Sequence, residues 1–190
     1  MLKKIIEADR YLFLKINQEG KNSFFDLIMP FIREAKFWTP LYLLILLFVV
    51  LNFGKKAIWW VLTAACTVTF TDTLSSKIIK PLISRPRPCM EPDFSIKVRL
   101  LANYCGSNGS FTSSHAANHF GLAMFFYMTM RHIFPNGIYL FFVWAAAICY
   151  AQVYAGVHYP TDVIGGALIG MFAGWVAGKL FNSKVGLLQK

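Results

Sequence analysis

The sequence predicts an all-α polytopic membrane protein, in which five transmembrane helices form a bundle behind an N-terminal interfacial helix. Hydrophobic residues make up 56% of the 190 positions and the mean hydropathy is +0.50, which is too apolar for a soluble domain of this length. Several stretches are uncharged over nearly the length that a bilayer crossing needs. Charged residues collect where these stretches end, as they do at membrane surfaces.

The N-terminal segment is expected to lie along the membrane surface. Between Ile5 and Ile16, apolar side chains are mixed with acidic and basic ones in the manner of an amphipathic interfacial helix. Residues 24–32 are apolar but short and contain Pro30, so we expect a re-entrant or interfacial piece there rather than a sixth crossing. The first 20 residues lack a compact apolar core with a small-residue cleavage site, so no cleaved signal peptide is predicted.

Five apolar stretches are expected to cross the membrane. They comprise residues 37–53, 57–80, 111–130, 137–157 and 163–177. The first ends before the basic pair Lys55 and Lys56, and the second ends where Pro81 lacks the N–H that would continue a helix. Glycines recur through the last stretch, which favours close packing against another helix.

Residues 81–110 form the one long polar loop between these stretches, and Cys89 and Cys105 flank part of it. In an oxidising compartment the two cysteines would form a disulfide that stabilises the loop by about 3 kcal/mol, and elsewhere they would remain free thiols. Cys66 and Cys149 lie inside apolar runs and are expected to be small core residues.

The net charge of +10 results from 19 basic and 9 acidic residues. Anchoring of helix ends at an anionic membrane surface accounts for most of this excess. The remaining cations lie around the polar loop and suit an anionic ligand; they are Lys80, Arg85, Arg87, Lys97 and Arg99. Nucleic-acid binding is not expected, because the basic residues are not interleaved with exposed aromatic ones. No Cys or His spacing indicates a metal site.

Three polar clusters lie where apolar stretches begin or end. They are Lys80 to Pro88 (K-P-L-I-S-R-P-R-P), Ser110 to Ala116 (S-F-T-S-S-H-A) and Gly156 to Asp162 (G-V-H-Y-P-T-D). Counting the crossings places all three on one membrane face. The opposite face carries basic anchors, which the positive-inside rule assigns to the cytoplasm: Lys55, Lys56, Arg131, Lys179 and Lys184.

An ionisable group within a membrane helix costs about 2.5 to 3.5 kcal/mol, so the clusters need either a functional reason or snorkelling to the interface. Their order resembles the type 2 phosphatidic acid phosphatase family over roughly residues 37–179: K-x6-R-P at Lys80, Arg87 and Pro88, then a P-S-G-H-like segment, then an R-x5-H-x3-D-like set. The resemblance implies an integral membrane enzyme that removes phosphate from lipid phosphates and diphosphates without a metal or other cofactor. The family shares its site design with vanadium haloperoxidases and glucose-6-phosphatases.

The resemblance also implies a role for each matching residue. His158 would attack phosphorus and become a phosphohistidine, while Asp162 orients the ring. His115 would protonate the leaving group and then activate water. The phosphate would be bound by Lys80, Arg87, the Ser113 hydroxyl, and the backbone N–H groups of Ser114 and His115 at a helix N-terminus.

The sequence departs from the family pattern at two places. Ala151 and Gln152 replace the usual Ser-Arg pair, so Gln152 would offer phosphate an amide hydrogen bond but no charge, and Arg85 is a candidate to compensate. Residues 112–115 read T-S-S-H in place of P-S-G-H. Because Ser114 lacks the freedom of glycine at positive φ, we expect an ordinary backbone conformation there.

Three further polar residues have simpler interpretations. His115 and His119 are four residues apart and could present two metal ligands on a helix, but no third ligand is evident. We therefore expect His119 and Asn118 to be packed polar residues. His132, beside Arg131, is expected to be interfacial.

These expectations define one domain over residues 1–190, with an interfacial segment (1–36), a catalytic helical core (37–181) and a loop on the side of the active site (81–110). Undecaprenyl diphosphate is the leading substrate, because small single-domain members of the family commonly recycle it. Phosphatidylglycerol phosphate, phosphatidic acid and lipid A 1-phosphate follow. A non-catalytic lipid-phosphate binder and a haloperoxidase-like site are the alternatives.

We expect the protein to reside in the bacterial inner membrane, with its active site facing the periplasm and with membrane lipids as its surroundings. Nothing in the sequence indicates an oligomeric state.

Overall fold

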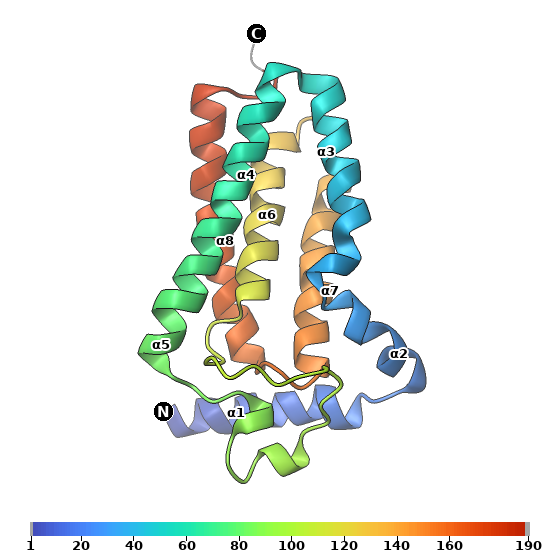
Figure 1. The fold of residues 1–190 in the computed structure, drawn as a ribbon, viewed down its shortest axis with the longest axis vertical. Helices are drawn as coiled ribbons and strands as arrows, with labels where there is room; N and C mark the ends of the chain where they lie inside the picture. Colours follow the sequence, from blue (N-terminus) through green and yellow to red (C-terminus); the bar gives the residue numbers. More distant parts are fainter. Residues whose placement is uncertain (1, 189–190) are drawn as a thin grey trace.

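A computed structural model describes residues 2–188, and this part of the chain contains helices and loops but no strand. Five long helices lie side by side in a bundle (Figure 1). They are α3 (Thr39–Phe53), α4 (Lys55–Thr73), α6 (Ser114–Met130), α7 (Leu140–Tyr154) and α8 (Pro160–Lys184). The predicted all-α fold class is therefore confirmed.

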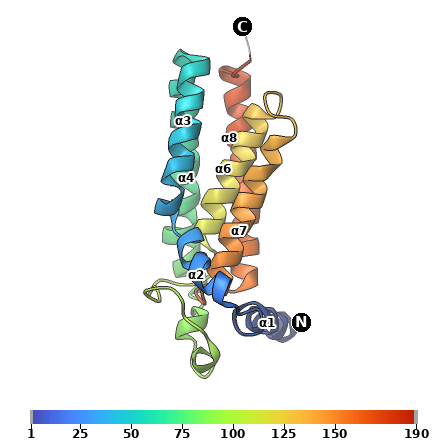
Figure 2. The same cartoon turned by 90° about the vertical axis from the view of Figure 1, so that its right-hand side faces the viewer.

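The N-terminal helices do not join the bundle as crossings. Helix α1 (Leu2–Leu14), extended by a π-helical turn at Lys15–Glu19, lies across one end of the bundle, and Figure 2 looks along its axis. Helix α2 (Ser23–Ile32) has 10 residues, too few to cross a bilayer, so the structure contains no sixth crossing there. A 3-10 turn at Ala35–Trp38 leads into α3.

Four segments within residues 2–188 are long and apolar enough to cross a membrane, namely Ala35–Phe53, Lys55–Met90, Gly137–Tyr154 and Pro160–Lys184. The remaining predicted crossing, at residues 111–130, corresponds to α6, which has only 17 residues. It contacts α4, α7 and α8, and many of its side chains are buried. A helix enclosed by protein does not need to match the bilayer thickness, because the loops at its ends contact protein rather than lipid.

Several predicted helix boundaries shift by a few residues, and two of these shifts bear on the polar clusters. The second crossing continues past Lys80 through a π-helical turn (Leu74–Ile79) into α5 (Lys80–Ile83), and ends at Ser84 with a φ of 49°. Pro81 is tolerated because it lies in the first turn of α5. Helix α6 begins at Ser114 rather than Phe111, because Ser113 caps it by accepting a hydrogen bond from Ala116 N.

Helices α6 and α8 approach each other closely, as the glycines of the last apolar stretch predict. A Cβ atom added at Gly170 would lie 2.2 Å from the Ala117 carbonyl oxygen, and one at Gly174 would lie 2.2 Å from the Gly121 carbonyl oxygen. Only glycine permits this spacing between the two backbones. The N-termini of both helices are thereby held next to each other at one end of the bundle.

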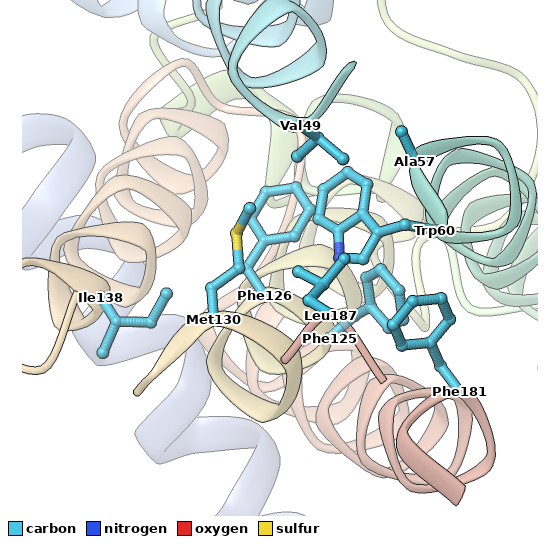
Figure 3. Packing of buried hydrophobic residues seen from close by; sticks show 9 residues of the cluster. All are labelled: Val49, Ala57, Trp60, Phe125, Phe126, Met130, Ile138, Phe181 and Leu187. Carbon is cyan, nitrogen blue, oxygen red and sulfur yellow. The ribbon is translucent and has the colours of Figure 1, made fainter. Parts of the chain in front are cut away.

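An aromatic core holds together the bundle end remote from α1 (Figure 3). The Trp60 ring of α4 stacks on Phe126 of α6 with 5.1 Å between ring centres, and its Nε1 donates to Thr129 Oγ1 at 2.9 Å. Phe125 of α6 contacts Phe181 of α8 edge-on. This packing joins three of the long helices.

The expectation that both Cys66 and Cys149 are core residues is half wrong. Cys149 is buried, but Cys66 is exposed on the outer surface of α4. In a membrane protein the surface that faces lipid is as apolar as the core, so an apolar run does not reveal which side chains point inward.

Candidate active site

The three polar clusters meet at the end of the bundle that carries α1, where α5 ends and where α6 and α8 begin (Figure 1). A cavity of about 640 Å³ opens there. Six of the residues expected to bind or cleave the phosphate line it: Lys80, Arg87, Ser114, His115, Gln152 and His158. Side chains separated by up to 78 positions are thus brought to one enclosure. The sequence did not single out Arg33, Asp72, Ser76 or Tyr104, which also line it.

His158 lies in the loop between α7 and α8 and is 2% exposed. Its Nδ1 is 3.5 Å from Asp162 Oδ2 and 3.4 Å from Ser110 Oγ, while its Nε2 lies 3.4 Å from Arg87 Nη1 at the cavity. Burial lowers the pKa of His158 to about 4, and the Asp162 carboxylate offsets only part of that effect. The ring is therefore neutral at pH 7 and can present an unprotonated Nε2 to a ligand.

Asp162 lies in the first turn of α8 and is fully buried. Its Oδ2 accepts hydrogen bonds from Tyr159 N at 2.8 Å and Ser110 Oγ at 2.5 Å, and its Oδ1 accepts one from Arg85 Nη1 at 2.9 Å. Pro160 begins the helix without needing a donor. These contacts fix the carboxylate against the Nδ1 side of His158.

The structure does not support Arg85 as the substitute for the missing family arginine. Its guanidinium joins two buried carboxylates, Asp162 on one side and Asp9 of α1 at 2.6 Å on the other, and it lies 4.1 Å from the ring centre of Tyr159. It also donates to Thr161 Oγ1 at 2.7 Å. Arg85 therefore binds the Asp162 oxygen that does not contact His158, and it is not among the residues that line the cavity around His158.

Lys80 and Arg87 supply positive charge to the cavity. Lys80 is only 4% exposed, and its Nζ has no hydrogen-bond partner within residues 2–188. Arg87 is held by the loop, because its Nε and Nη2 donate to the backbone carbonyl and the side-chain Oδ1 of Asn108, each at 3.1 Å. A disulfide joins Cys89 to Cys105, with 6.2 Å between the Cα atoms, and ties this loop together.

The start of α6 differs from expectation at one residue. Ser113 is fully buried as the cap of the helix, donates its backbone N–H to the Asp162 carbonyl at 3.0 Å and is not on the cavity wall. Ser114 lines the cavity instead, and its Oγ lies 3.0 Å from Ser75 Oγ. Ser114 has a helical backbone, as predicted. The N–H groups of Ser114 and His115 form the electropositive first turn of α6.

His115 lines the cavity, and the next histidine on α6 does not. His119 Nδ1 donates to the His115 carbonyl at 2.7 Å, and its Nε2 lies 3.1 Å from the Tyr42 hydroxyl. Asn118 accepts a hydrogen bond from Thr71 at 2.7 Å. Both are packed polar residues. Within the described chain, no three His, Cys, Asp or Glu side chains gather as they would around a metal ion.

His132 is exposed at the far end of the bundle, with its Nε2 at 3.4 Å from Arg131 Nε.

Gln152, near the end of α7, is 1% exposed and contacts Arg33 at the end of α2. The Gln152 Nε2 donates to the Arg33 carbonyl at 3.2 Å, and its Oε1 accepts from Arg33 Nε at 3.4 Å. No role was expected for Arg33 from the sequence, where it directly follows the short apolar segment at residues 24–32. The only signal for it was the neutral residue at position 152, which leaves the site short of one cation.

Comparison with known proteins agrees with this geometry. The sequence matches the PAP2 superfamily over residues 57–185. It is 35% identical over 180 residues to the lipid A 4′-phosphatase of Bacteroides thetaiotaomicron, covering 93% of this chain and 78% of that protein. It is 34% identical over 185 residues to the lipid A 4′-phosphatase of Porphyromonas gingivalis, covering 93% and 74%.

The fold resembles the crystal structure of a transmembrane PAP2-type phosphatidylglycerolphosphate phosphatase from Bacillus subtilis, with a TM-score of 0.71 over 98% of this chain and 90% of that one. At 22% identity this likeness concerns the fold alone.

Proposed function

The chain belongs to the PAP2 superfamily and is a membrane lipid phosphatase, and we propose that it removes the 4′-phosphate of a lipid A-type glycolipid through a phosphohistidine at His158. The substrate assignment rests on the similarity to two lipid A 4′-phosphatases over 93% of the chain. The mechanism rests on one observation: His158 is backed by Asp162 and faces Lys80 and Arg87 across a single cavity.

In the first step, the lone pair of His158 Nε2 attacks phosphorus and forms a P–N bond. The bond from phosphorus to the sugar oxygen breaks, and that oxygen takes a proton from His115. Asp162 accepts a hydrogen bond from the Nδ1 hydrogen and stabilises the ring as it becomes positive. Lys80, Arg87 and the N–H groups at the start of α6 neutralise the charge that spreads over the phosphoryl oxygens.

In the second step, His115 takes a proton from a water molecule whose oxygen attacks the phosphohistidine. The P–N bond breaks, its electron pair returns to His158, and inorganic phosphate leaves. His115 thus acts first as acid and then as base, and both histidines return to their starting states.

A second cavity suits the hydrocarbon chains of the substrate. This apolar groove of about 580 Å³ is lined by residues of α3, α4 and α6, including Leu46, Ala64 and Leu122. His119, one helical turn beyond His115, also lines it. We propose that the acyl chains lie in this groove, between the helices, while the phosphate occupies the polar cavity at the end of the bundle.

Phosphate release from a panel of lipids tests the proposal. Purified protein is given lipid A, undecaprenyl diphosphate, phosphatidylglycerol phosphate and phosphatidic acid, and mass spectrometry of the product distinguishes the 1- from the 4′-phosphate of lipid A. We expect release from the 4′ position. Undecaprenyl diphosphate, the leading substrate on sequence grounds, remains an untested prediction, and its selective hydrolysis would overturn the lipid A assignment.

Three histidine variants test the mechanism in the same assay. H115A should lower kcat about 10²- to 10⁴-fold, as the loss of a general acid does, and H158A should lower it at least as much. H132A, at the far end of the bundle, is the matched control and should retain wild-type turnover. Wild-type rates in H158A would exclude the phosphohistidine route.

We infer that the active site faces the extracytoplasmic side of a bacterial inner membrane. Two observations support this orientation: a disulfide borders the site, and Lys55, Lys56 and Arg131 lie at the other end of the bundle. In intact cells, a membrane-impermeant maleimide should label S107C, in the loop by the site, and spare N136C at the far end. Labelling of N136C but not of S107C would show that the active site faces the cytoplasm.

A further inference from the structure

The phosphate site lacks a cation where the family carries an arginine, since Gln152 is neutral. Phosphoryl transfer spreads negative charge over three oxygens, and fixed cations around them are the main source of rate enhancement. Lys80 and Arg87 both come from the segment that follows α4. The wall formed by α7 would therefore present no charge of its own.

Arg33 places a charge at this wall. Its side chain is 7% exposed, and it lines the same cavity as Lys80, Arg87 and His158. Its Nη1 pairs with the exposed carboxylate of Glu34 at 2.7 Å, while its Nη2 has no hydrogen-bond partner within residues 2–188. A buried guanidinium at a cavity wall thus retains an unused donor.

Gln152 fits the task of holding this guanidinium. Its amide donates to the backbone carbonyl of Arg33 and accepts from the side-chain Nε of the same residue. An amide side chain offers a donor and an acceptor in one planar group, whereas an arginine has no acceptor. The two hydrogen bonds hold the backbone carbonyl and the Nε of Arg33, so that Nη2 is left without a partner within residues 2–188. They also engage the amide with which Gln152 was expected to bind phosphate.

The backbone around Arg33 is fixed as well. Arg33 N donates to the Met29 carbonyl at 3.1 Å, and the indole of Trp38 donates to the Ile32 carbonyl at 2.8 Å. Met29 packs in a buried cluster with Ala151, the residue before Gln152. The end of α2 is therefore docked against α7 and not free to swing away.

We propose that Arg33 is the third phosphate-binding cation of the active site, supplied by α2 in place of the family arginine and positioned by Gln152. This inference rests on the proposed function only in that the cavity binds a phosphoryl group. It also gives the N-terminal segment a direct part in the site, beyond anchoring at the membrane.

Binding of orthovanadate, a phosphate mimic, to the purified full chain tests the assignment by calorimetry, without any need for turnover. R33Q should bind vanadate about 10- to 100-fold more weakly, the usual cost of losing a charge-assisted hydrogen bond. The double variant R33Q/Q152R should recover most of the loss, because it returns a guanidinium to the same wall. R131Q, the same substitution on an exposed arginine at the far end, should bind like wild type.

Recovery in the double variant is the readout that a merely structural role would not produce. Wild-type affinity in R33Q, or a folded double variant that binds no better than R33Q, would overturn the assignment. If R33Q does not elute as a folded protein, the vanadate affinity of R33K is measured instead. Lysine keeps the charge but not the planar fork, so its affinity should fall about threefold to tenfold, and an unchanged affinity would contradict the proposal.

The test separates this inference from the proposed function. If wild type binds vanadate but releases phosphate from no lipid, the enzymatic proposal fails while the vanadate affinities still decide on Arg33. If wild type binds no vanadate, the cavity is not a phosphate site and both fail.

Discussion

Replacing Gly170 by alanine should damage both stability and activity, although the residue does not line the cavity. The added Cβ would meet three backbone atoms of α6, the nearest being the Ala117 carbonyl oxygen at 2.2 Å. An ordinary contact at this position is 3.4 Å or longer, so α6 and α8 must separate by about 1 Å. No flexible side chain can move aside to spare them. Overpacking of this kind costs about 1 to 3 kcal/mol.

The separation also reaches the active site, because His115 lies in the first turn of α6 and His158 lies two residues before α8 begins. A 1 Å displacement between reacting groups can lower a rate by about 10²-fold. We therefore expect G170A to unfold at a lower temperature than wild type and to lose about tenfold to 10²-fold in kcat/KM. Size-exclusion chromatography of samples heated to a series of temperatures measures the unfolding. G137A is the matched control, since nothing lies within 4 Å of a Cβ there. Equal behaviour of the two variants would refute the close-packing argument.

Three other perturbations have defined outcomes. C89S removes the disulfide that ties down the loop around the site, so it should raise KM and lower stability by up to about 3 kcal/mol in thermal or chemical unfolding. The acidic limb of kcat/KM against pH should lie well below 6.5, because attack needs a neutral His158, whose pKa burial lowers to about 4. R85M leaves the buried Asp162 without its cation and should cost about 3 to 5 kcal/mol of unfolding free energy, together with turnover.

Each of these has a control and a contradicting result. Reductant should reproduce C89S in wild type and change nothing further in the variant. An acidic limb at or above pH 6.5 would mean that burial does not dominate the titration of His158. K15Q breaks the exposed pair with Glu19, which solvent screens, and should leave the unfolding free energy close to that of wild type. If R85M costs no more than K15Q, Arg85 does not hold the carboxylate.

The sequence predicted the part of the site that lies at the ends of the long helices. Lys80, Arg87, His115 and His158 each follow or precede an apolar stretch, so counting crossings was enough to place them at one face. Helix phase was harder to predict. A shift of three residues in the start of α6 turns Ser113 into a buried cap and leaves Ser114 on the cavity wall.

The N-terminal contributions could not be predicted from local patterns. Asp9 reaches Arg85 and Arg33 reaches Gln152 only because α1 and α2 dock against the end of the bundle. An amphipathic segment reveals which face is apolar but not where that face will rest. The same limit applies to Cys66, because side chains that face lipid and side chains that face the core have the same composition.

Trapping the covalent intermediate tests the central claim most directly. Purified protein is mixed with lipid carrying a ³²P-labelled phosphate, quenched in alkali within milliseconds to seconds, digested and mapped by mass spectrometry. We expect an acid-labile phosphoryl group on His158 that forms and decays at the rate of turnover and is absent from H158A. A phosphoryl group on any other residue, or turnover with no protein-bound phosphate at any time, would contradict it.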